Sequence, residues 1–516
     1  MKKIVSLSAI LIFTATIIIF GQSPYLDEDF GTGGKVITNP GYQGSRGNSV
    51  AIQPDGKILM AGYNDIGAIY DFILVRYNTD GTMDNSFSQD GKVFTDFESA
   101  YEYARSLAIQ QDGNIIVAGN SNTFFALARY NPDGIIDSSF GEYGKIITDF
   151  ADEGYYKCGP LTILPDGKIL LAGSLGETGA LVRYKPDGTP DSTFCEDGKL
   201  EVDFGDPDDE YLSISMAVQQ DGKIVVSGFS SGFNYDFTVL RYKPDGTLDS
   251  LFGTDGKVTT DIYNSTDDRS RALTIQQDGK ILVAGWSGLQ SDGRNDWDFG
   301  LARYNTDGTP DVSFGNDGKV ITDLKGLWDD RPEAIAVQSD GKILVAGYTY
   351  ITGESDFALM RYNTDGSPDS TVNGSGLITT DFNNSSNDYG MSIAIQPDGK
   401  IIVAGFSDDN IAIVRYLPDI ALRAIDLSDD GNPILVYPVP VANEAILKYS
   451  LYRDEILSIS LYDNTGNKVQ SFIDKEKRAA GVHTEAVNVN PLLSPGGYIL
   501  ELRTPSKRVY MKIIKN

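Results

Sequence analysis

Few residue types in this chain can carry out acid–base or metal chemistry. The 516 residues include one histidine, His483, and two cysteines, Cys158 and Cys195, against 72 aspartates and glutamates. This leaves almost no room for multi-histidine mechanisms or for zinc sites built from histidine and cysteine. Carboxylate chemistry stays open, and glycoside hydrolysis needs two acids about 5 to 9.5 Å apart. The sequence singles out no such pair, so we predict no catalytic residue.

Calcium binding by a repeated acidic turn is a second candidate chemistry. Six copies of (N/K)-x-D-G-x-x-D occur, the first of them with Asn78, Asp80 and Asp84. Oxygen ligands at this density could hold calcium, but the turn lacks the glycine at position six and the distal glutamate of an EF-hand loop. Capping of the turn by its own aspartates accounts for the same pattern. We expect no cofactor and no metal, with calcium at these three residues as the alternative.

The three tryptophans, Trp286, Trp297 and Trp328, fall within 43 residues. The first two flank a segment between Gly285 and Asp298 that is longer than its counterparts elsewhere in the chain. Aromatic side chains exposed on loops suit sugar rings or a protein hot spot. We therefore predict that these tryptophans bind a ligand, and padding of an irregular loop is the alternative.

All of these side chains have to be positioned by a repeat that occurs seven times. Its markers are an Asp-Gly turn, an Arg-Tyr pair and a D-x-x-(F/V) segment. The Asp-Gly turns begin at Asp55, Asp112, Asp166, Asp221, Asp278, Asp340 and Asp398. The Arg-Tyr pairs begin at Arg76, Arg129, Arg183, Arg241, Arg303, Arg361 and Arg415. Between the markers, short runs rich in Ile, Val, Phe and Tyr alternate with polar residues, which predicts four strands per repeat. Asp-Gly supplies the positive φ angles of a tight hairpin, so each repeat is predicted as an antiparallel meander.

Four-stranded meanders repeated four to eight times are typical of a β-propeller. We predict an all-β fold with seven blades over residues 22–418, and an open solenoid is the alternative. After Arg415-Tyr416 no further G-K-V strand follows, whereas residues 34–38 (G-K-V-I-T) stand without a partner near the start of the chain. The N-terminal strand is therefore expected to complete blade seven. The seven arginines are expected to form ion pairs or carbonyl contacts from blade to blade.

These markers resemble the delta-60 repeat, a bacterial repeat family. The matching pieces are L-D-x-x-F-G, D-G-K-I-x-V-A-G and D-F-x-L-x-R-Y-N-x-D-G, over about residues 25–418. The resemblance implies a propeller of unknown function, and it brings no activity with it.

Both ends of the chain carry segments of a different kind. A basic start at Lys2 and Lys3 and an apolar run over residues 4–20 predict a signal peptide at 1–21, with an uncleaved anchor as the alternative. An acidic linker is predicted at 419–432. Residues 433–516 carry several strand-like runs, which predict a small Ig-like β-sandwich.

The C-terminal segment resembles the sorting domains of the type IX secretion system of Bacteroidota. The resemblance rests on Tyr437, Pro438, Pro440, Gly466, Gly481, Gly496, Tyr498 and Lys512. It implies that the type IX machinery is a partner, that the chain crosses the outer membrane, and that this tail is then removed. The mature protein would be released or attached to the outer cell surface. An ordinary accessory sandwich is the alternative.

Such a destination is oxidising, which permits a disulfide. Cys158 and Cys195 fall in the same repeat, but the sequence does not give the distance between their Cα atoms, so the bond is left open.

Charge and composition limit the function classes further. The formal net charge of −29 would repel a phosphate backbone, so we expect no nucleic-acid partner, and we expect a monomer. We predict a secreted or cell-surface propeller that binds a glycan or a protein. The alternatives are a carbohydrate-active hydrolase or lyase that uses paired carboxylates, and a purely structural surface scaffold.

Overall fold

The computed structural model describes 25–41, 44–67, 69–150, 156–176, 178–205, 213–230, 234–263, 266–291, 294–324, 329–351, 353–383, 386–418, 435–437, 444–451, 453–463, 467–494, 496–505 and 508–515. The predicted signal peptide and the predicted linker lie outside these residues.

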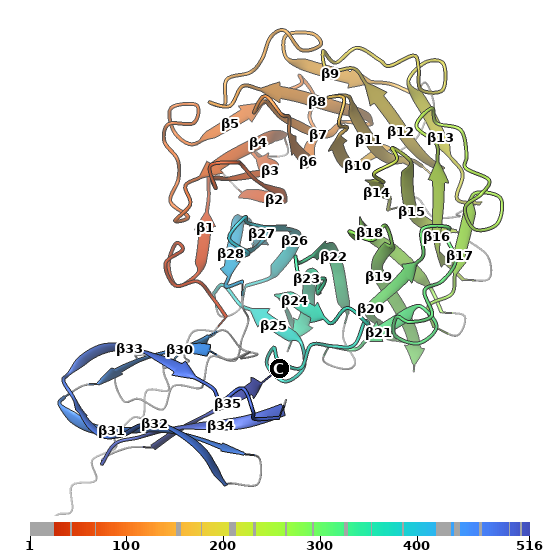
Figure 1. Ribbon diagram of the computed structural model, residues 1–516. Coiled ribbons are helices and arrows are strands. Elements are labelled where there is room, and N and C mark those ends of the chain that lie inside the picture. The colour runs from red at the N-terminus through yellow and green to blue at the C-terminus, as the bar shows by residue number, and fades with distance from the viewer. Residues whose placement is uncertain are drawn as a thin grey trace, which may run out of the picture.

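Seven four-stranded antiparallel sheets stand around a central axis (Figure 1), as the repeat predicts. The first strand of each blade lies nearest to the axis. These innermost strands are β2 (Gly44–Ile52), β6 (Glu102–Ile109), β10 (Tyr156–Ile163), β14 (Ser215–Val218), β18 (Asp268–Ile275), β22 (Asp330–Val337) and β26 (Asp388–Ile395). The second strands are β3 (Ile58–Asp65), β7 (Ile115–Ser121), β11 (Ile169–Leu175), β15 (Ile224–Ser230), β19 (Ile281–Ser291), β23 (Ile343–Ile351) and β27 (Ile401–Ser407).

The outer two strands complete each blade. The third strands are β4 (Tyr70–Tyr77), β8 (Phe124–Tyr130), β12 (Thr178–Tyr184), β16 (Asp236–Tyr242), β20 (Arg294–Tyr304), β24 (Glu354–Tyr362) and β28 (Asn410–Tyr416). The fourth are β5 (Lys92–Thr95), β9 (Lys145–Thr148), β13 (Lys199–Val202), β17 (Lys257–Thr260), β21 (Lys319–Thr322), β25 (Leu377–Thr380) and, from the N-terminus, β1 (Lys35–Thr38). Strand β1 pairs with β28 from Lys35 opposite Val414 to Thr38 opposite Ile411, which confirms the predicted closure of blade seven.

The hydrophobic core lies between neighbouring blades. One cluster joins Leu59 and Phe72 of the first blade to Leu107 and Ile115 of the second, all of them buried. Because each blade presents apolar faces to both neighbours, the ring has to close to bury the last of them.

In six of the seven Arg-Tyr pairs the arginine donates to a backbone carbonyl of the next blade. Arg76 donates from Nε to Asp84 at 2.7 Å and from one terminal nitrogen to the Pro132 carbonyl in the following blade at 2.5 Å. Its guanidinium also lies 4.4 Å from the ring centre of Phe87, the aromatic residue of the D-x-x-F segment. Equivalent carbonyl contacts join Arg129 to Pro186, Arg183 to Pro244, Arg241 to Thr306, Arg303 to Thr364 and Arg415 to Thr79. The predicted blade-to-blade role is therefore present.

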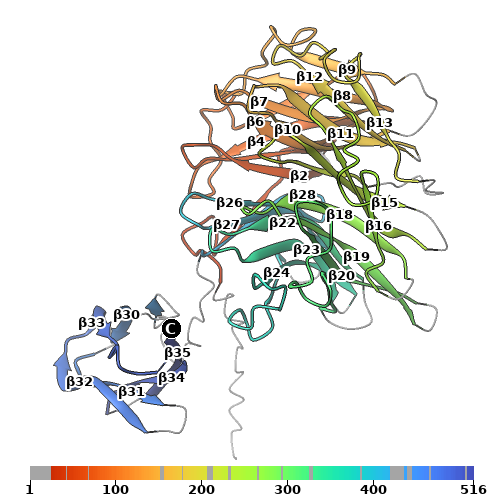
Figure 2. The same cartoon turned by 45° about the vertical axis from the view of Figure 1, so that its right-hand side comes forward.

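The C-terminal strands form a body apart from the blades (Figures 1 and 2). One sheet has the order β29 (Leu435–Tyr437), β30 (Glu444–Leu451) and β33 (Gly481–Asn488). The other has the order β32 (Lys468–Arg478), β31 (Glu455–Asp463), β34 (Gly496–Arg503) and β35 (Arg508–Lys515). One core cluster holds residues of both sheets, including Leu447 and Leu461. This is the arrangement of a sandwich, and its Ig-like character stays a prediction.

Candidate functional site

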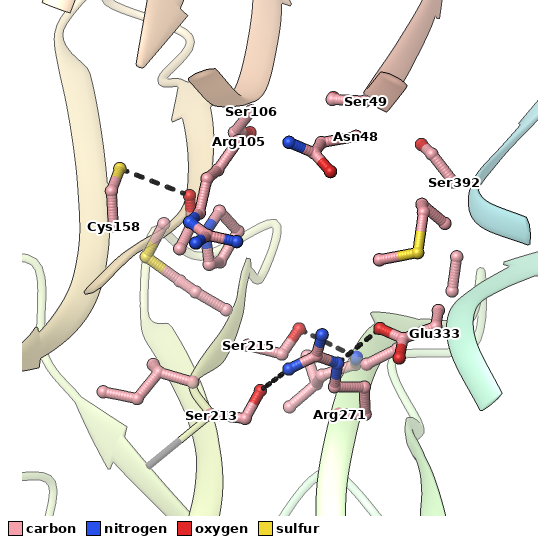
Figure 3. A pocket seen from close by; sticks show the side chains of 18 of the residues that line it. Asn48, Ser49, Arg105, Ser106, Cys158, Ser213, Ser215, Arg271, Glu333 and Ser392 are labelled. Carbon is pink, nitrogen blue, oxygen red and sulfur yellow. Dashed lines mark hydrogen bonds and ion pairs between the residues drawn. The ribbon is translucent and has the colours of Figure 1, made fainter. Parts of the chain in front are cut away.

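Bulges on the innermost strands build a cavity on the propeller axis. In six blades the pairing between the first and second strands shifts register at the same level, as between Ala104 and Ser106 on β6. A bulge leaves a residue out of the ladder and re-aims its side chain. The residues left out are Asn48, Arg105, Gly159 with Pro160, Arg271, Glu333 and Met391. All of them line one cavity of about 300 Å³ (Figure 3).

The lining of this cavity carries three cations and one carboxylate. Arg271 donates from Nε to Glu333 at 2.5 Å and from a terminal nitrogen to the Ser213 hydroxyl at 2.9 Å, as Figure 3 shows. Arg105 and Lys157 form no ion pair with any described residue, and the Nε of Arg105 is buried without a hydrogen-bond partner. The cavity therefore holds a local excess of positive charge inside a chain whose formal net charge is −29.

The nearby cations and burial shift the pKa values of the groups that line the cavity. The Arg271 guanidinium, burial and the Arg105 guanidinium lower the pKa of Lys157 to about 7, against the opposing pull of Glu333. Burial lowers the pKa of Arg105, and Arg271 adds to this effect. Burial raises the pKa of Cys158 to about 12, so this thiol is not a nucleophile at neutral pH. Repulsion among these cations costs free energy, and a bound anion would offset it.

Aromatic residues recur at one position of the second strands. An Ala-Gly or Ser-Gly pair lies at the centre of each second strand, and the residue after it is aromatic in five of the seven blades. In chain order the seven residues are Tyr63, Asn120, Ser174, Phe229, Trp286, Tyr348 and Phe406. Each of the five aromatic rings meets a residue on the innermost strand of the next blade. Two meetings are between rings, namely Tyr63 with Tyr103 at 4.9 Å and Tyr348 with Tyr389 at 4.8 Å. In the other three, Arg269 lies over Phe229, Arg331 over Trp286 and Arg46 over Phe406.

The half-exposed part of this ring runs over blades six, seven, one and two. We call it the aromatic arc, and it consists of Tyr348, Tyr389, Phe406, Tyr63, Tyr103, Tyr70 and Tyr101. Arg46 joins its two halves, because it lies 4.9 Å from the ring centre of Phe406 and pairs across the ladder with Tyr63. A hollow of about 500 Å³ is lined by Tyr348, Tyr389 and Phe406 together with Arg271 and Glu333. The arc and the cationic cavity are therefore continuous.

The structure corrects the placement of two tryptophans in a loop, while their binding of a ligand stays a prediction. The segment between Gly285 and Asp298 is not a loop, because β19 and β20 continue their hairpin to Ser291 and Arg294. Trp286 lies on β19 and is only 7% exposed, and Trp297 lies half-buried on β20. Their rings meet edge to face at 6.5 Å, and the Arg331 guanidinium packs on both. Trp328 lies outside the described residues.

The predicted calcium turn is held by its own hydrogen bonds. Asp80 accepts from the backbone and hydroxyl of Thr82 at 2.9 and 2.6 Å, and Asn78 donates to the same hydroxyl. Asp84 pairs with Arg76 and Lys57. These are the contacts of the capping alternative, and calcium binding by the three residues stays a prediction.

Carboxylates that could hold a cation lie elsewhere, at four junctions between blades. The groups are Asp71, Asp96 and Glu102; Asp236, Asp261 and Asp268; Asp298, Asp323 and Asp330; and Asp356, Asp381 and Asp388, with the oxygens of each within 4.8 Å of one another. Carboxylates this close either share protons or hold a cation. Burial raises the pKa of Asp268 to about 6, which favours sharing a proton. In three groups a lysine of the next blade, Lys145, Lys319 or Lys35, also donates to a backbone carbonyl of the group.

The two cysteines are free thiols, so the disulfide left open by the sequence is not formed in the structure. Cys158 is buried on β10 in the core between blades two and three. Cys195 lies in the turn before β13, where its backbone N–H donates to the Asp245 carbonyl of the next blade at 3.2 Å. The single histidine, His483, lies in the C-terminal body and stacks on Tyr449 at 5.2 Å.

The residues of the sorting motif occupy strand ends and one core position. Tyr498 on β34 is buried and donates to the Ser494 carbonyl at 2.7 Å. Gly481 and Gly496 begin β33 and β34, Tyr437 ends β29, and Lys512 lies on β35 opposite Ile499. Pro438, Pro440 and Gly466 lie outside the described residues.

Sequence reasoning missed the cavity and the arc. The three tryptophans are a distinctive signal because they are rare in this sequence. The aromatic arc is built from tyrosine and phenylalanine, which are common in it. A readable signal was present, since an aromatic residue follows the V-A-G segment or its variant in five repeats. The bulge had no comparable signal, because Asn48, Arg105, Arg271, Glu333 and Met391 share no side-chain chemistry.

Two family models match the chain. One is described as a domain of unknown function (DUF5122) beta-propeller and matches residues 53–87, 110–140, 164–194, 219–252, 276–314, 338–371 and 396–419. The other is the secretion system C-terminal sorting domain, at residues 435–516. No curated protein sequence matches the chain.

Solved structures resemble the chain at low identity. Virginiamycin B lyase from Staphylococcus aureus is 13% identical with a TM-score of 0.44, and the match covers 74% of this chain and 99% of that one. PorZ, a surface component of the type-IX secretion system of Porphyromonas gingivalis, is 13% identical with a TM-score of 0.40, over 90% of this chain and 59% of that one. Polysaccharide lyase Uly1 is 11% identical with a TM-score of 0.42, over 78% and 94%. At these TM-scores the likenesses carry no argument about activity.

The family matches agree with the division into blades and tail. No helix among the described residues is long and apolar enough to span a bilayer. The sorting domain indicates export, with the secretion machinery as a partner. The blades therefore form a DUF5122 β-propeller repeat region, and the C-terminal sorting domain makes the chain a secreted or cell-surface protein.

Proposed function

We propose that this protein is a glycan-binding module of the cell surface, and that the glycan lies across the aromatic arc. The observation that carries the proposal is the row of half-exposed rings over four adjacent blades, interrupted only by Arg46. Sugar rings present C–H faces that pack on aromatic side chains, while the tyrosine hydroxyls supply hydrogen bonds to sugar hydroxyls. A row of such rings fits an extended chain better than a single monosaccharide.

The alternatives receive less support from the geometry. A hydrolase acting through paired carboxylates needs two acids that face the bound sugar. Glu333 is the one carboxylate among the described residues that line the cavity, and Arg271 holds it at 2.5 Å. Asp408 and Asp409 line the adjoining hollow, where Asp408 accepts from the Asn387 N–H and Asp409 pairs with Arg46. A pure scaffold would not need rings exposed to solvent around its axis, since burial is what makes aromatic residues stabilising.

A glycan array with the purified full chain tests the proposal. Tyr389→Ala and Tyr103→Ala each remove one ring of the arc, and Tyr143→Ala removes a ring that is 78% exposed in a turn beside β9. Losing one stacked ring should weaken binding by about tenfold, because such a contact contributes on the order of 1 kcal/mol or more. The control should bind as the unaltered chain does.

The array also separates the competing functions. Turnover of a bound polysaccharide would favour the hydrolase or lyase, and binding of a protein from the cell surface with no glycan signal would favour a protein receptor. The absence of any glycan binding on the array, or equal binding by Tyr389→Ala and Tyr143→Ala, would contradict the proposal.

A further inference from the structure

Two unpaired cations in the axial cavity need an explanation. A buried guanidinium is normally paired, because leaving it without a partner costs several kcal/mol. Arg105 nevertheless keeps its Nε buried without a hydrogen-bond partner, and Lys157 forms no ion pair with a described carboxylate, although Glu333 acts on it from a distance. They belong to the neighbouring strands β6 and β10, whereas the lining next to β14 includes the neutral Ile214, which directly precedes that strand.

The surroundings make this cluster a built site. The bulge on β6 aims Arg105 into the cavity, and the bulge on β18 aims Arg271 into it from the far side (Figure 3). Arg271 is fixed by Glu333 and the Ser213 hydroxyl, so it cannot turn away. Two serine hydroxyls of the lining are also committed, because Ser106 accepts from the Leu161 N–H and Ser215 accepts from the Leu273 N–H. Accepting leaves each hydroxyl its own O–H, so the lining offers an anion the cations and these two hydroxyls as donors.

We propose that the axial cavity binds one anionic group, a carboxylate or a sulfate, carried by a sugar whose chain lies on the aromatic arc. Arg105 and Lys157 are its main ligands, and Arg271 adds its field while staying paired with Glu333. The assignment rests on the proposed glycan binding for the carrier of the anion, but the cavity itself can be tested with a single sugar. A cavity of about 300 Å³ admits one sugar ring with its acidic group and does not admit a longer chain.

The net charge of the protein does not oppose this assignment. Charges on the rim are screened over about 8 Å at physiological ionic strength, whereas charges in a cavity with low-dielectric walls are screened far less. The acids nearest to the hollow are already engaged, since Asp409 pairs with Arg46 at 3.3 Å and Asp408 accepts from the Asn387 N–H at 3.0 Å.

Proton uptake should accompany binding. The pKa of Lys157 is about 7 in the empty cavity, and an anion beside the ammonium raises it. The charged groups that face Lys157 are Arg105 on β6, Arg271 on β18 and Glu333 on β22, and its neighbour Cys158 stays neutral. The described lining from β2, β14 and β26 adds no titratable group. Affinity should therefore be highest below pH 7 and fall as the pH rises above it.

Calorimetry of the full chain with glucuronate, glucose 6-sulfate and glucose tests the site, because the three sugars differ at one carbon. Both anionic sugars, or one of them, should bind at least tenfold more tightly than glucose. Lys157→Gln and Arg105→Gln should remove this preference, whereas the matched change Lys185→Gln, at an exposed turn, should leave it intact. Equal binding of the three sugars, or an equal effect of all three substitutions, would overturn the assignment.

Two measurements distinguish the possible causes of a negative result. Tm reports a folding defect, and the comparison of polysaccharide with single-sugar binding separates the arc from the cavity. Arg105→Gln removes a half-buried cation that has no ion-pair partner, so the Tm of this variant should stay the same or rise. A clear fall in Tm would mean that Arg105 has a structural role, and the assignment would fail. If the array finds no glycan but glucuronate binds and Lys157→Gln abolishes it, the cavity assignment stands and the proposed glycan function does not. If Tyr389→Ala weakens polysaccharide binding while Lys157→Gln changes nothing, the proposed glycan function stands and the cavity assignment does not.

Discussion

Removing the Arg415 guanidinium should loosen the closure of the ring. Arg415 donates from Nε to Asp27 at 2.9 Å, contacts the Thr79 carbonyl of blade one and lies 4.4 Å from the ring centre of Phe30. The Arg415 and Asp27 side chains are 5% and 7% exposed. The Arg415→Gln substitution therefore leaves a buried carboxylate without its main partner, between segments that are joined only by closure.

The size of the effect follows from these contacts. Breaking a buried ion pair from one side costs about 3–5 kcal/mol. Lys400 stays 3.1 Å from Asp27, so the lower end of about 3 kcal/mol applies. A propeller of roughly 390 residues unfolds with an entropy of about 0.8 kcal/mol/K, so Tm should fall by about 4 °C.

Arg241→Gln is the matched control, because Arg241 has the same set of partners inside the continuous chain. Its Nε donates to Asp249 at 2.8 Å, it contacts the Thr306 carbonyl, and it lies 4.6 Å from the ring centre of Phe252. Both substitutions should lower Tm by a similar amount in calorimetry. Only Arg415→Gln should speed hydrogen exchange in residues 25–38. An unchanged Tm for Arg415→Gln, or equal exchange in that segment for both variants, would refute the closure argument.

Three further outcomes can be checked on the same protein. Protein recovered from the surface of its native host should lack residues 1–21 and most of 433–516 by intact mass, and recovery of the whole tail on mature protein would contradict the sorting role. A thiol reagent should modify one cysteine in the folded chain and two after denaturation, because Cys158 is buried and Cys195 is not; no reaction after denaturation would show a disulfide. Burial raises the pKa of Asp268 to about 6, so the stability that its proton confers is complete below about pH 4 and is lost as the pH rises through 6. Asp268→Asn should flatten denaturation midpoints measured between pH 4 and 7, and an unchanged slope would contradict the raised pKa.

The architecture could be predicted because the repeat markers are structural. The Asp-Gly turns, the arginines and the buried Phe of D-x-x-F recur since each solves a problem that every blade shares, namely a hairpin, a link to the next blade and a core. Gly56, with φ of +84°, sits in such a turn, and Arg76 with Phe87 forms such a link. The missing last strand identified β1 for the same reason.

The candidate site could not be predicted in the same way, because it is built from the positions where the repeats differ. Arg105, Arg271 and Glu333 occupy equivalent bulges, but a bulge is a property of register, and register is not visible in a strand read alone. The tryptophans illustrate the opposite error. Trp286 was expected in a loop because the hairpin was read as ending at Gly285, whereas the ladder continues to Ser291 and buries the ring.

The bulges separate the residues that make the fold from the residues that line the cavity. Six blades present a bulge to the axis, while the turns and the arginines of the Arg-Tyr pairs lie outside the innermost strands. Substitutions at the bulges can therefore change ligand preference without altering the residues that hold the propeller together. A library that randomises these positions on an unchanged frame would sample the chemistries that this propeller can recognise. The positions are Asn48, Arg105, Gly159, Pro160, Arg271, Glu333 and Met391.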